Sequence, residues 1–364
     1  MLSLVSGINM KITSCSILLL WVVCPAAFAQ NTTVVLANPA AVAAAVVTGN
    51  ERAIANYDKI IAADPQNSKA YFDRGTSKMR LRRYGDAIAD FSLAIMIKPE
   101  YSTAYNERAV CKYDLRLYAD AVADYTLAIQ TDPKFRSAYE NRGDAKTQMQ
   151  QYKSAIEDYD QVLLLDSAYS YAYLNRGRAK GKLDMHEDAI ADFTKAIAYA
   201  PLNITGYIYR SEEKGKLNDI TGQLADIEKA IAVNPRSGLP YIERGGVEAK
   251  QSKYAEAVAD MDKAIALIPA SEVYYNLRGN YKIKNNQFTE AIPDFAKAIE
   301  LKPEVAEPYN SLGYAYYKLG VTRDNFINAV AYYDLASVLG KQGYKPNYEY
   351  RQQAALSINR FVGK

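Results

Sequence analysis

Proline recurs along this 364-residue chain with a fixed step of 34 residues. Ser167 occupies the one vacant point of this register. The prolines that define the register are Pro65, Pro99, Pro133, Pro201, Pro235, Pro269 and Pro303. A step of this length is typical of a helix–turn–helix unit that is repeated and stacked. Proline ends a helix because it has no N–H to donate and clashes with the preceding turn. The register therefore predicts an all-α repeat architecture, which favours binding over catalysis.

Other columns of residues keep the same step between the prolines. They recur at spacings of three and four, which places them on one face of a helix. Small residues let two helices approach closely, and aromatic residues fill the space beside them. The aromatic column that opens each unit is Tyr71, Tyr105, Tyr139, Tyr173, Tyr207, Tyr241, Tyr275 and Tyr309. The small column four residues later is Gly75, Ala109, Gly143, Gly177, Ser211, Gly245, Gly279 and Gly313.

The stretch AYENRGDAKTQMQQYKSAIEDYDQVLLLDS at 138–167 resembles a tetratricopeptide repeat, with tyrosine in place of the family's usual leading tryptophan. Both the period and the column chemistry agree, and the resemblance covers residues 68–339. It implies a right-handed superhelical α-solenoid of about eight to nine stacked helix–turn–helix repeats with a C-terminal capping helix. It also implies that the first helix of each hairpin lines a concave groove, where extended peptides or helices of partner proteins bind.

The register and its flanks divide the chain into five segments. They are a secretory signal at 1–29, a degenerate N-terminal repeat at 34–67, seven regular repeats at 68–305, an eighth repeat with four extra residues at 306–343, and a capping helix at 344–364. In the degenerate repeat, residues 38–48 and 53–65 are expected to form two helices, with Gly49 just past the end of the first. A capping helix suits the end of the stack because the last apolar face would otherwise be open to water.

The first 29 residues have the pattern of a secretory signal. Lys11 is the only charged residue before Glu51, a short apolar run covers 17–23, and an A-x-A motif at 27–29 predicts cleavage before Gln30. The apolar run is too short for a membrane span, which needs about 20 residues. We expect an exported protein, periplasmic or extracellular. A retained signal anchor is the alternative.

Cysteine content and charge add two expectations. Cleavage would remove Cys15, Cys24 and the only tryptophan, Trp21, and Met10 is an alternative start. The remaining thiol, Cys111, would form no internal disulfide and is expected to be buried and inert. The 44 basic and 41 acidic residues nearly cancel, which gives no reason to expect a nucleic acid or another polyanion as partner.

Two charged columns predict ion pairs inside the stack. Arginine and aspartate recur in the same seven units, and in the eighth unit both change together, to Leu312 and Tyr332. Pairing within each hairpin leaves no residue without a partner. The expected pairs are Arg74 with Asp90, Arg108 with Asp124, Arg142 with Asp158, Arg176 with Asp192, Arg210 with Asp226, Arg244 with Asp260, and Arg278 with Asp294. A ladder of ligand-binding arginines is the alternative.

A lysine column lies four residues after the arginines, near the ends of the first helices. It comprises Lys78, Lys112, Lys146, Lys180, Lys214 and Lys282. Cations are favourable near a helix C-terminus, so these lysines are expected to be solvated. A basic track for a ligand is the alternative.

The sequence gives no signal of catalysis. His186 is the only histidine, which excludes a metal site built from several histidines. No glycine-rich phosphate loop is present. We therefore expect no enzyme activity, no catalytic residue, no metal site and no cofactor. His186 is expected to pack in a turn where other units carry tyrosine.

The exposed stripe of the first helices is the expected binding surface. Its candidate partner-binding residues are Asn141, Asn175, Arg178, Lys182, Lys216, Lys250, Asn276, Asn280, Asn310 and Tyr317. The carboxylate clamp of some family members is not supported, because only Asn141 or Asn175 matches its positions.

Two functions remain open at this point. One is an exported scaffold or adaptor that binds a protein or peptide, in envelope assembly or secretion. The other is a component of a polysaccharide export or assembly system that contacts glycan or its secretion machinery, for which 31 tyrosines offer stacking surfaces. The oligomeric state is left open.

Overall fold

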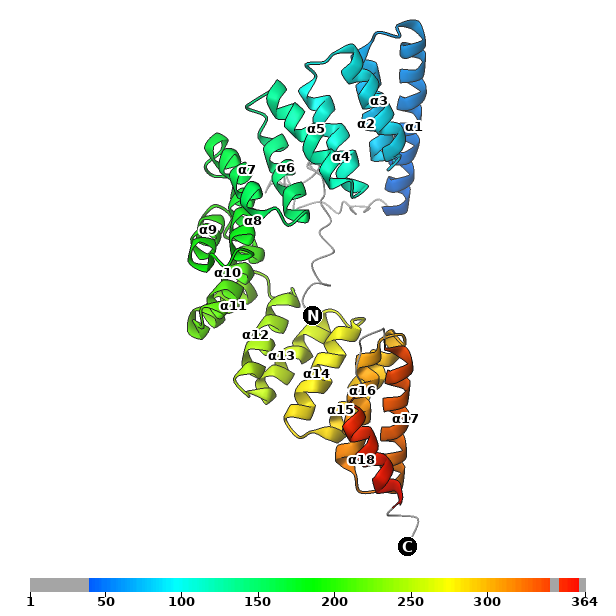
Figure 1. Ribbon diagram of the computed structural model, residues 1–364, viewed down its shortest axis with the longest axis vertical. Coiled ribbons are helices and arrows are strands. Elements are labelled where there is room, and N and C mark those ends of the chain that lie inside the picture. Colours follow the sequence, from blue (N-terminus) through cyan, green and yellow to red (C-terminus); the bar gives the residue numbers. More distant parts are fainter. Residues whose placement is uncertain (1–38, 341–346, 360–364) are drawn as a thin grey trace, which may run out of the picture.

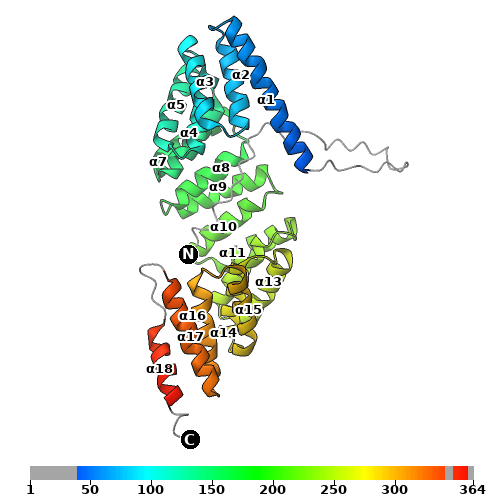
Figure 2. The ribbon, with the colours of Figure 1, turned by 90° about the vertical axis from the view of Figure 1, so that its right-hand side faces the viewer.

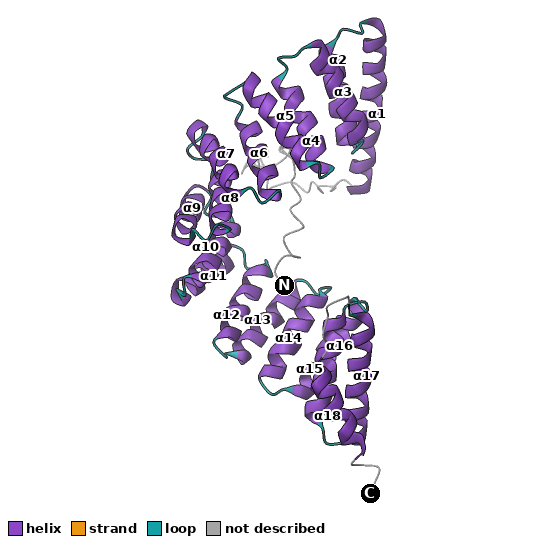
Figure 3. Cartoon of the chain, in the orientation of Figure 1, coloured by secondary structure: helices purple, strands orange, loops and turns teal. Residues whose placement is uncertain are grey.

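The computed structural model describes residues 39–340 and 347–359, so the predicted signal at 1–29 lies outside the described residues. The described part folds into eighteen α-helices and contains no strand (Figure 3). This confirms the all-α repeat solenoid predicted from the proline register. Helix α1 (Pro39–Ala63) opens the stack, eight helical hairpins follow, and α18 (Tyr348–Asn359) closes it.

Each hairpin consists of a first and a second helix. The first helices are α2 (Ser68–Arg80), α4 (Ser102–Asp114), α6 (Arg136–Gln148), α8 (Ser170–Gly181), α10 (Ile204–Lys216), α12 (Leu239–Lys250), α14 (Glu272–Lys284) and α16 (Ala306–Leu319). The second helices are α3 (Tyr84–Ile97), α5 (Tyr118–Thr131), α7 (Tyr152–Leu165), α9 (His186–Tyr199), α11 (Ile220–Val233), α13 (Tyr254–Leu267), α15 (Phe288–Leu301) and α17 (Arg323–Leu339).

The hairpins stack in chain order into one curved array. Each second helix packs against the first helix of the next hairpin, and α1 and α18 pack against the two ends. In Figure 1 the array bends so that α1 and α17 lie on one side and α9 on the other, and a quarter turn shows a continuous stack from α1 to α18 (Figure 2). Neighbouring first helices, such as α4 and α6, also touch one another, and neighbouring second helices do so less. The first helices therefore lie on the inner side of the curve.

The small and aromatic columns make the core of each hairpin. In the fourth hairpin, a methyl group added at Gly177 would lie 2.8 Å from a ring carbon of Phe193. Phe193 is itself only 1% exposed, and Ala189 beside it is fully buried. Close helix approach and ring packing are thus coupled, because a larger residue at Gly177 would displace a ring that has no free space.

The turn inside each regular hairpin uses a left-handed residue. Seven non-glycine residues with positive φ recur at the 34-residue step. They are Arg82, Arg116, Gln150, Asp184, Asn218, Ser252 and Asn286. In the eighth hairpin Gly320 ends α16 with φ of 41°. This conformation lets the first helix end by bonding its last carbonyls, as Arg83 N does with Lys78 O at 2.9 Å.

The prediction of an N-terminal hairpin at 38–48 and 53–65 is wrong. Residues 39–63 form the single 25-residue helix α1, which continues through Gly49 without a turn. Asn50 Nδ2 donates to the carbonyl of Val46 at 2.8 Å, a bond made within the helix. One interior glycine costs about 1 kcal/mol, which is too little to break a segment that has no proline between Pro39 and Pro65.

The C-terminal end of the stack is closed as the capping-helix prediction expects. Thr322 caps α17 by accepting from Asn325 N at 3.2 Å. Helix α18 packs against α16 and α17, and Arg351 Nε is 2.5 Å from Asp334 Oδ1. The last hairpin is therefore covered on its open side.

Candidate partner-binding surface

The seven predicted Arg–Asp pairs are all formed in the structure. In each of these seven hairpins an arginine Nη2 lies 2.5 to 2.7 Å from an aspartate Oδ1, and the aspartate side chains are only 2 to 5% exposed. The arginine Nε also donates to the same carboxylate, as Arg142 does to Asp158 at 3.1 Å. The two-point contact joins the two helices of one hairpin in a defined orientation.

The expectation that the lysine column is solvated is wrong. Each of its six lysines lies 2.7 to 2.8 Å from the second oxygen of the same aspartate, and the lysine side chains are 14 to 21% exposed. Lys146, for example, pairs with Asp158 at 2.8 Å. Six of the seven buried aspartates therefore carry two cations, which is how their charge tolerates burial. The ion-paired unit is an Arg–Lys–Asp triad.

The arginines also join neighbouring hairpins. In six of the seven, Nη1 donates to an oxygen on the preceding second helix or on α1, such as Asp160 Oδ1 for Arg176 at 2.6 Å. Arg74 has Asp58 of α1 as this partner, and hydrogen bonding to Asp90 raises the pKa of Arg74 further above its ordinary value. Because their N–H donors are bonded within the stack, these arginines have a structural role. Few of their donors remain to bind a ligand.

The tyrosine that opens each unit also makes contacts within the stack. Arg142 Cζ lies 5.6 Å from the centre of the Tyr139 ring, and the same contact recurs at 5.4 to 5.9 Å in all seven arginine-bearing hairpins. In several units the tyrosine hydroxyl donates to a carbonyl six residues earlier, as Tyr207 does to Pro201. These rings contribute cation–π contacts to the stack, and one face of each is covered.

We call the side chains that the first helices and their C-cap residues place on the inner side of the curve the inner face. Its central part is a hydrogen-bonded network. Asn141 Nδ2 donates to Asn106 Oδ1 at 3.3 Å, and Asn175 Nδ2 donates to Asp144 Oδ1 at 3.0 Å. Asp144 also accepts from the hydroxyl of Tyr159 at 2.8 Å. The predicted residues Asn141 and Asn175 are thus on adjacent first helices, but their amides already have partners within the protein.

The next part of the inner face carries mixed charge. The Arg178 guanidinium lies over the Tyr209 ring at 5.2 Å. Lys216 Nζ is 2.7 Å from Glu213 Oε1, and the other Glu213 oxygen is 2.7 Å from His186 Nδ1. His186 starts α9 and therefore links two hairpins through Glu213, which the sequence did not indicate.

Lys182 and Lys250 are exposed on this face and have no carboxylate within 4.0 Å among the described residues. Two glutamates lie in the same region. Burial raises the pKa of Glu243, with Lys250 opposing the shift. Glu212 is open to solvent but flanked by neighbouring first helices, and the reduced hydration together with Glu243 raises its pKa to about 7.

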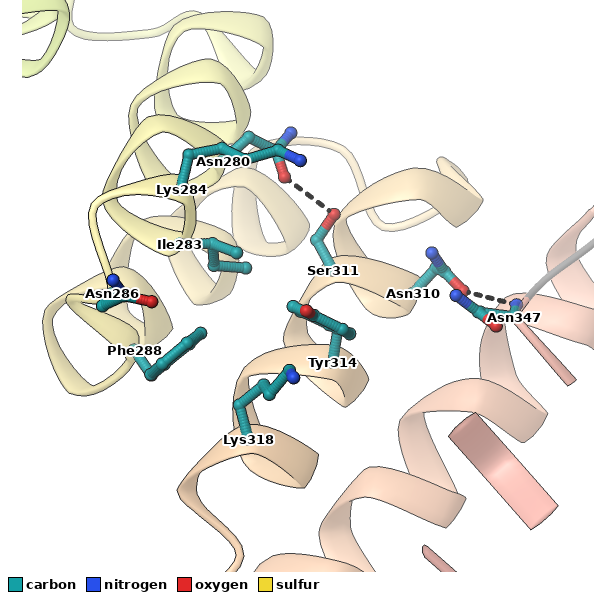
Figure 4. Close-up of a pocket in the computed structure, with 10 residues that line it drawn as sticks. All are labelled: Asn280, Ile283, Lys284, Asn286, Phe288, Asn310, Ser311, Tyr314, Lys318 and Asn347. Atoms are coloured by element: carbon teal, nitrogen blue, oxygen red, sulfur yellow. Dashed lines mark hydrogen bonds between the residues drawn. The ribbon is translucent and has the colours of Figure 1, made fainter. Parts of the chain in front are cut away.

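The C-terminal part of the inner face contains a pocket between α14 and α16, with a volume of about 410 Å³ (Figure 4). Asn280 and Asn310 line it, with Ser311, Tyr314, Lys284 and Lys318 beside them. Asn280 Oδ1 accepts from Ser311 Oγ at 3.1 Å, and Asn310 Oδ1 accepts from Asn347 N at 3.0 Å.

Two other predicted residues lie outside this pocket. Asn276 has a buried Oδ1 without a hydrogen-bond partner among the described residues. Tyr317 donates to Gln353 Oε1 of α18 at 2.5 Å and packs against Tyr350, with ring centres 5.2 Å apart. Because α18 covers it, Tyr317 is removed from the candidate surface.

Lys284 and Lys318 were not among the predicted residues, although the sequence held a signal for them. The same step of 34 residues places a lysine at the end of five successive first helices. These lysines are Lys182, Lys216, Lys250, Lys284 and Lys318. One side of the pocket, Asn347, is placed by the docking of α18, which a column of residues does not show.

The described residues contain no group of three or more His, Cys, Asp or Glu side chains arranged to hold a metal ion. Cys111 is fully buried, and burial raises the pKa of its thiol to about 12, so it is a packing residue. None of the helices described here is long and apolar enough to cross a membrane.

The fold and this surface define the class of the protein, an α-helical repeat scaffold. Residues 40–102, 73–134, 137–169 and 170–201 match family models described as tetratricopeptide repeat, and 279–320 matches a model described as TPR repeat. These matches together span more than half of the chain. The chain belongs to the tetratricopeptide-repeat family.

The comparison with solved structures found similar chains. A tetratricopeptide repeat protein from Parabacteroides merdae is 18% identical, with a TM-score of 0.55 over 69% of this chain and 99% of that chain. YrrB, described as a TPR protein with an unusual peptide-binding site, is 16% identical, with a TM-score of 0.45 over 49% of this chain and 92% of that chain. MamA is 23% identical, with a TM-score of 0.39 over 40% and 85%. A comparison with curated proteins gave no match.

Proposed function

We propose that this protein is an exported, non-enzymatic scaffold that binds a partner protein or peptide on its inner face, in envelope assembly or secretion. One observation carries the proposal. The triads satisfy the charges that hold the hairpins together, whereas Lys182, Lys250 and Lys284 are exposed on the inner face without an ion-pair partner among the described residues. The fold does not need these side chains, which makes the surface available for recognition.

The site of binding is tested by placing a photo-crosslinking amino acid at single positions. Positions 182 and 250 lie on the inner face, and positions 195 and 229 are exposed on second helices. In cells that express the protein, we expect one discrete crosslinked partner from the first two positions and none from the other two. Equal crosslinking from both pairs of positions would contradict binding on the inner face.

Export is supported by the pattern at 1–29 alone. If the signal is cleaved, intact-mass measurement of the purified protein will give a chain that begins at Gln30. The same protein will show tyrosine fluorescence without an indole signal, because Trp21 is the only tryptophan. A full-length mass in the cell envelope would instead support a retained anchor.

A further inference from the structure

We infer that the pocket between α14 and α16 binds a side-chain carboxylate of an extended acidic segment of the partner, with an apolar residue of the same segment beside it. This inference rests on the proposed function, since it names the chemistry of the partner that the inner face takes. It follows from three features of the pocket: which hydrogen-bonding groups are left over, where the charge is unbalanced, and which walls are apolar.

The hydrogen bonds inside the protein leave the pocket with donors. Asn347 N can only donate, so its bond to Asn310 fixes the Asn310 oxygen on that side and leaves Nδ2 to donate elsewhere. Asn280 likewise uses its oxygen to accept from Ser311 Oγ. Neither amide nitrogen has a partner among the described residues. A ligand that fits this set must accept hydrogen bonds, as a carboxylate does.

The charge of the pocket is positive and unbalanced. Lys284 and Lys318 line it, and none of its described lining residues carries a carboxylate. Lys318 lies 5.5 Å over the Tyr314 ring, and neither lysine has an acidic side chain within 4.0 Å in the described part of the chain. By contrast, Lys216 is paired with Glu213. Lys284 and Lys318 therefore line one pocket without an ion-pair partner among the described residues, and together they attract an anion.

The walls favour a peptide over a sugar. Ile283 and Phe288 form an apolar side opposite Tyr314 (Figure 4). The Tyr314 ring is already engaged by Lys318 on its face and by Tyr350, whose ring centre is 5.0 Å away at 64°. A sugar ring would therefore have to displace Lys318 to stack on that face of Tyr314. A carboxylate next to an aliphatic side chain matches both the donors and the apolar wall.

The inference is tested by fluorescence anisotropy with the full chain and two labelled twelve-residue peptides. One repeats Asp-Leu-Ser and the other repeats Asn-Leu-Ser, and both are acetylated and amidated so that only side chains differ in charge. We expect saturable binding of the Asp peptide at least tenfold tighter than that of the Asn peptide, weakening as salt is raised. The Lys284→Ala/Lys318→Ala variant should lose at least tenfold in affinity.

Two matched variants separate the pocket from general charge. Lys195→Ala/Lys229→Ala removes the same charge from second helices and should bind as the wild type does. Asn280→Asp keeps an acceptor for Ser311 but replaces the NH₂ donor with an anion, so it should also lose at least tenfold. Thermal unfolding of each variant establishes that it is folded, and Asn280→Asp serves as the reporter if the lysine double variant does not fold.

Three results would overturn the inference: equal affinity for both peptides, equal loss in the second-helix control, or tighter binding of an oligogalacturonate than of the Asp peptide. Unchanged Asp-peptide binding in the pocket variants, with crosslinking retained at positions 182 and 250, would refute this pocket and leave the proposed function in place. If positions 182 and 250 gave no crosslink while peptide binding still depended on the pocket, the result would refute the partner site at these two positions that the proposed function names.

Discussion

Glu248 lies where the other arginine-bearing hairpins carry the lysine of the triad, and its Oε1 is 4.0 Å from Arg244 Nε. Its second oxygen is buried and has no hydrogen-bond partner in the part of the chain that the structure describes. Burial, followed by the nearby charge of Asp260, raises the pKa of Glu248. The sixth hairpin thus places two carboxylates on one arginine where its neighbours place two cations on one carboxylate.

Replacing Glu248 with lysine should complete the sixth triad. The new Nζ would reach the Asp260 carboxylate as Lys282 reaches Asp294 at 2.8 Å. We expect the free energy of unfolding to rise by about 1 kcal/mol or more, since a partly buried pair forms and a carboxylate repulsion is removed. Urea unfolding would measure it. Glu100→Lys, on an exposed turn, changes the charge equally and should have little effect. A loss of stability in Glu248→Lys would count against the triad.

The eighth hairpin predicts how a triad can be replaced. There Leu312, Tyr316 and Tyr332 occupy the arginine, lysine and aspartate positions, and the two tyrosine rings are stacked with centres 5.6 Å apart. Arg142→Leu alone should destabilise by about 2–3 kcal/mol, because Asp158 keeps only Lys146 as its partner. Adding Asp158→Tyr should recover little, since Lys146 is then left without its anion.

The triple variant Arg142→Leu/Lys146→Tyr/Asp158→Tyr should recover more of the loss than the double variant. Chemical unfolding of all three, with the free energies compared in a cycle, separates the pair from the triad. If the double and triple variants were equally stable, the lysine would have no part in the unit.

The sequence predicted the repeat well because the same residue types recur at the same positions of eight units. A proline, a tyrosine and a small residue recur at fixed positions, and each one acts within its own hairpin. The error at the N-terminus has the opposite cause. Only a single glycine, Gly49, suggested a turn, and one glycine does not outweigh the hydrogen bonds of a continuous helix.

The ion pairs show how much can be predicted from residues that recur at the same position of each repeat. Arg142 and Asp158 were found because both are invariant across seven units. Lys146 was misinterpreted because the dipole argument considered only its own helix, whereas its partner lies across the hairpin. The pocket needed still longer-range information, since Asn310 and Asn347 meet only when α18 docks on α16.

The raised pKa of Glu212 predicts a pH effect. A carboxyl group whose pKa is raised on folding stabilises the fold fully below its unfolded pKa of about 4.3. That contribution is lost as the pH rises through the folded value of about 7. Glu212→Gln cannot ionise, so its stability relative to the wild type should increase between about pH 5 and about pH 8. Because Glu212 is open to solvent, the change will be small.

Urea unfolding of both proteins across this range provides the measurement. Glu187→Gln, an exposed position at the start of α9, is the matched control and should differ from the wild type by a constant amount. A relative stability of Glu212→Gln that fell with rising pH would show that the group is stabilised as an anion.

Two glycines make opposite predictions for the same substitution. A methyl at Gly177 would lie 2.8 Å from Phe193, whereas one at Gly246 would meet nothing within 4 Å. Gly177→Ala should therefore destabilise the protein by about 1–3 kcal/mol through overpacking. Gly246→Ala should stabilise it by about 0.5–1 kcal/mol, because alanine loses less backbone entropy in a helix.

Ala109 occupies the column of Gly177 in the second hairpin, so the backbone there can hold a methyl when the helices are spaced for it. Thermal and urea unfolding of both variants compare the two effects directly. Equal changes in stability would mean that the spacing of α8 and α9 is not set by contact between this glycine and the phenylalanine ring.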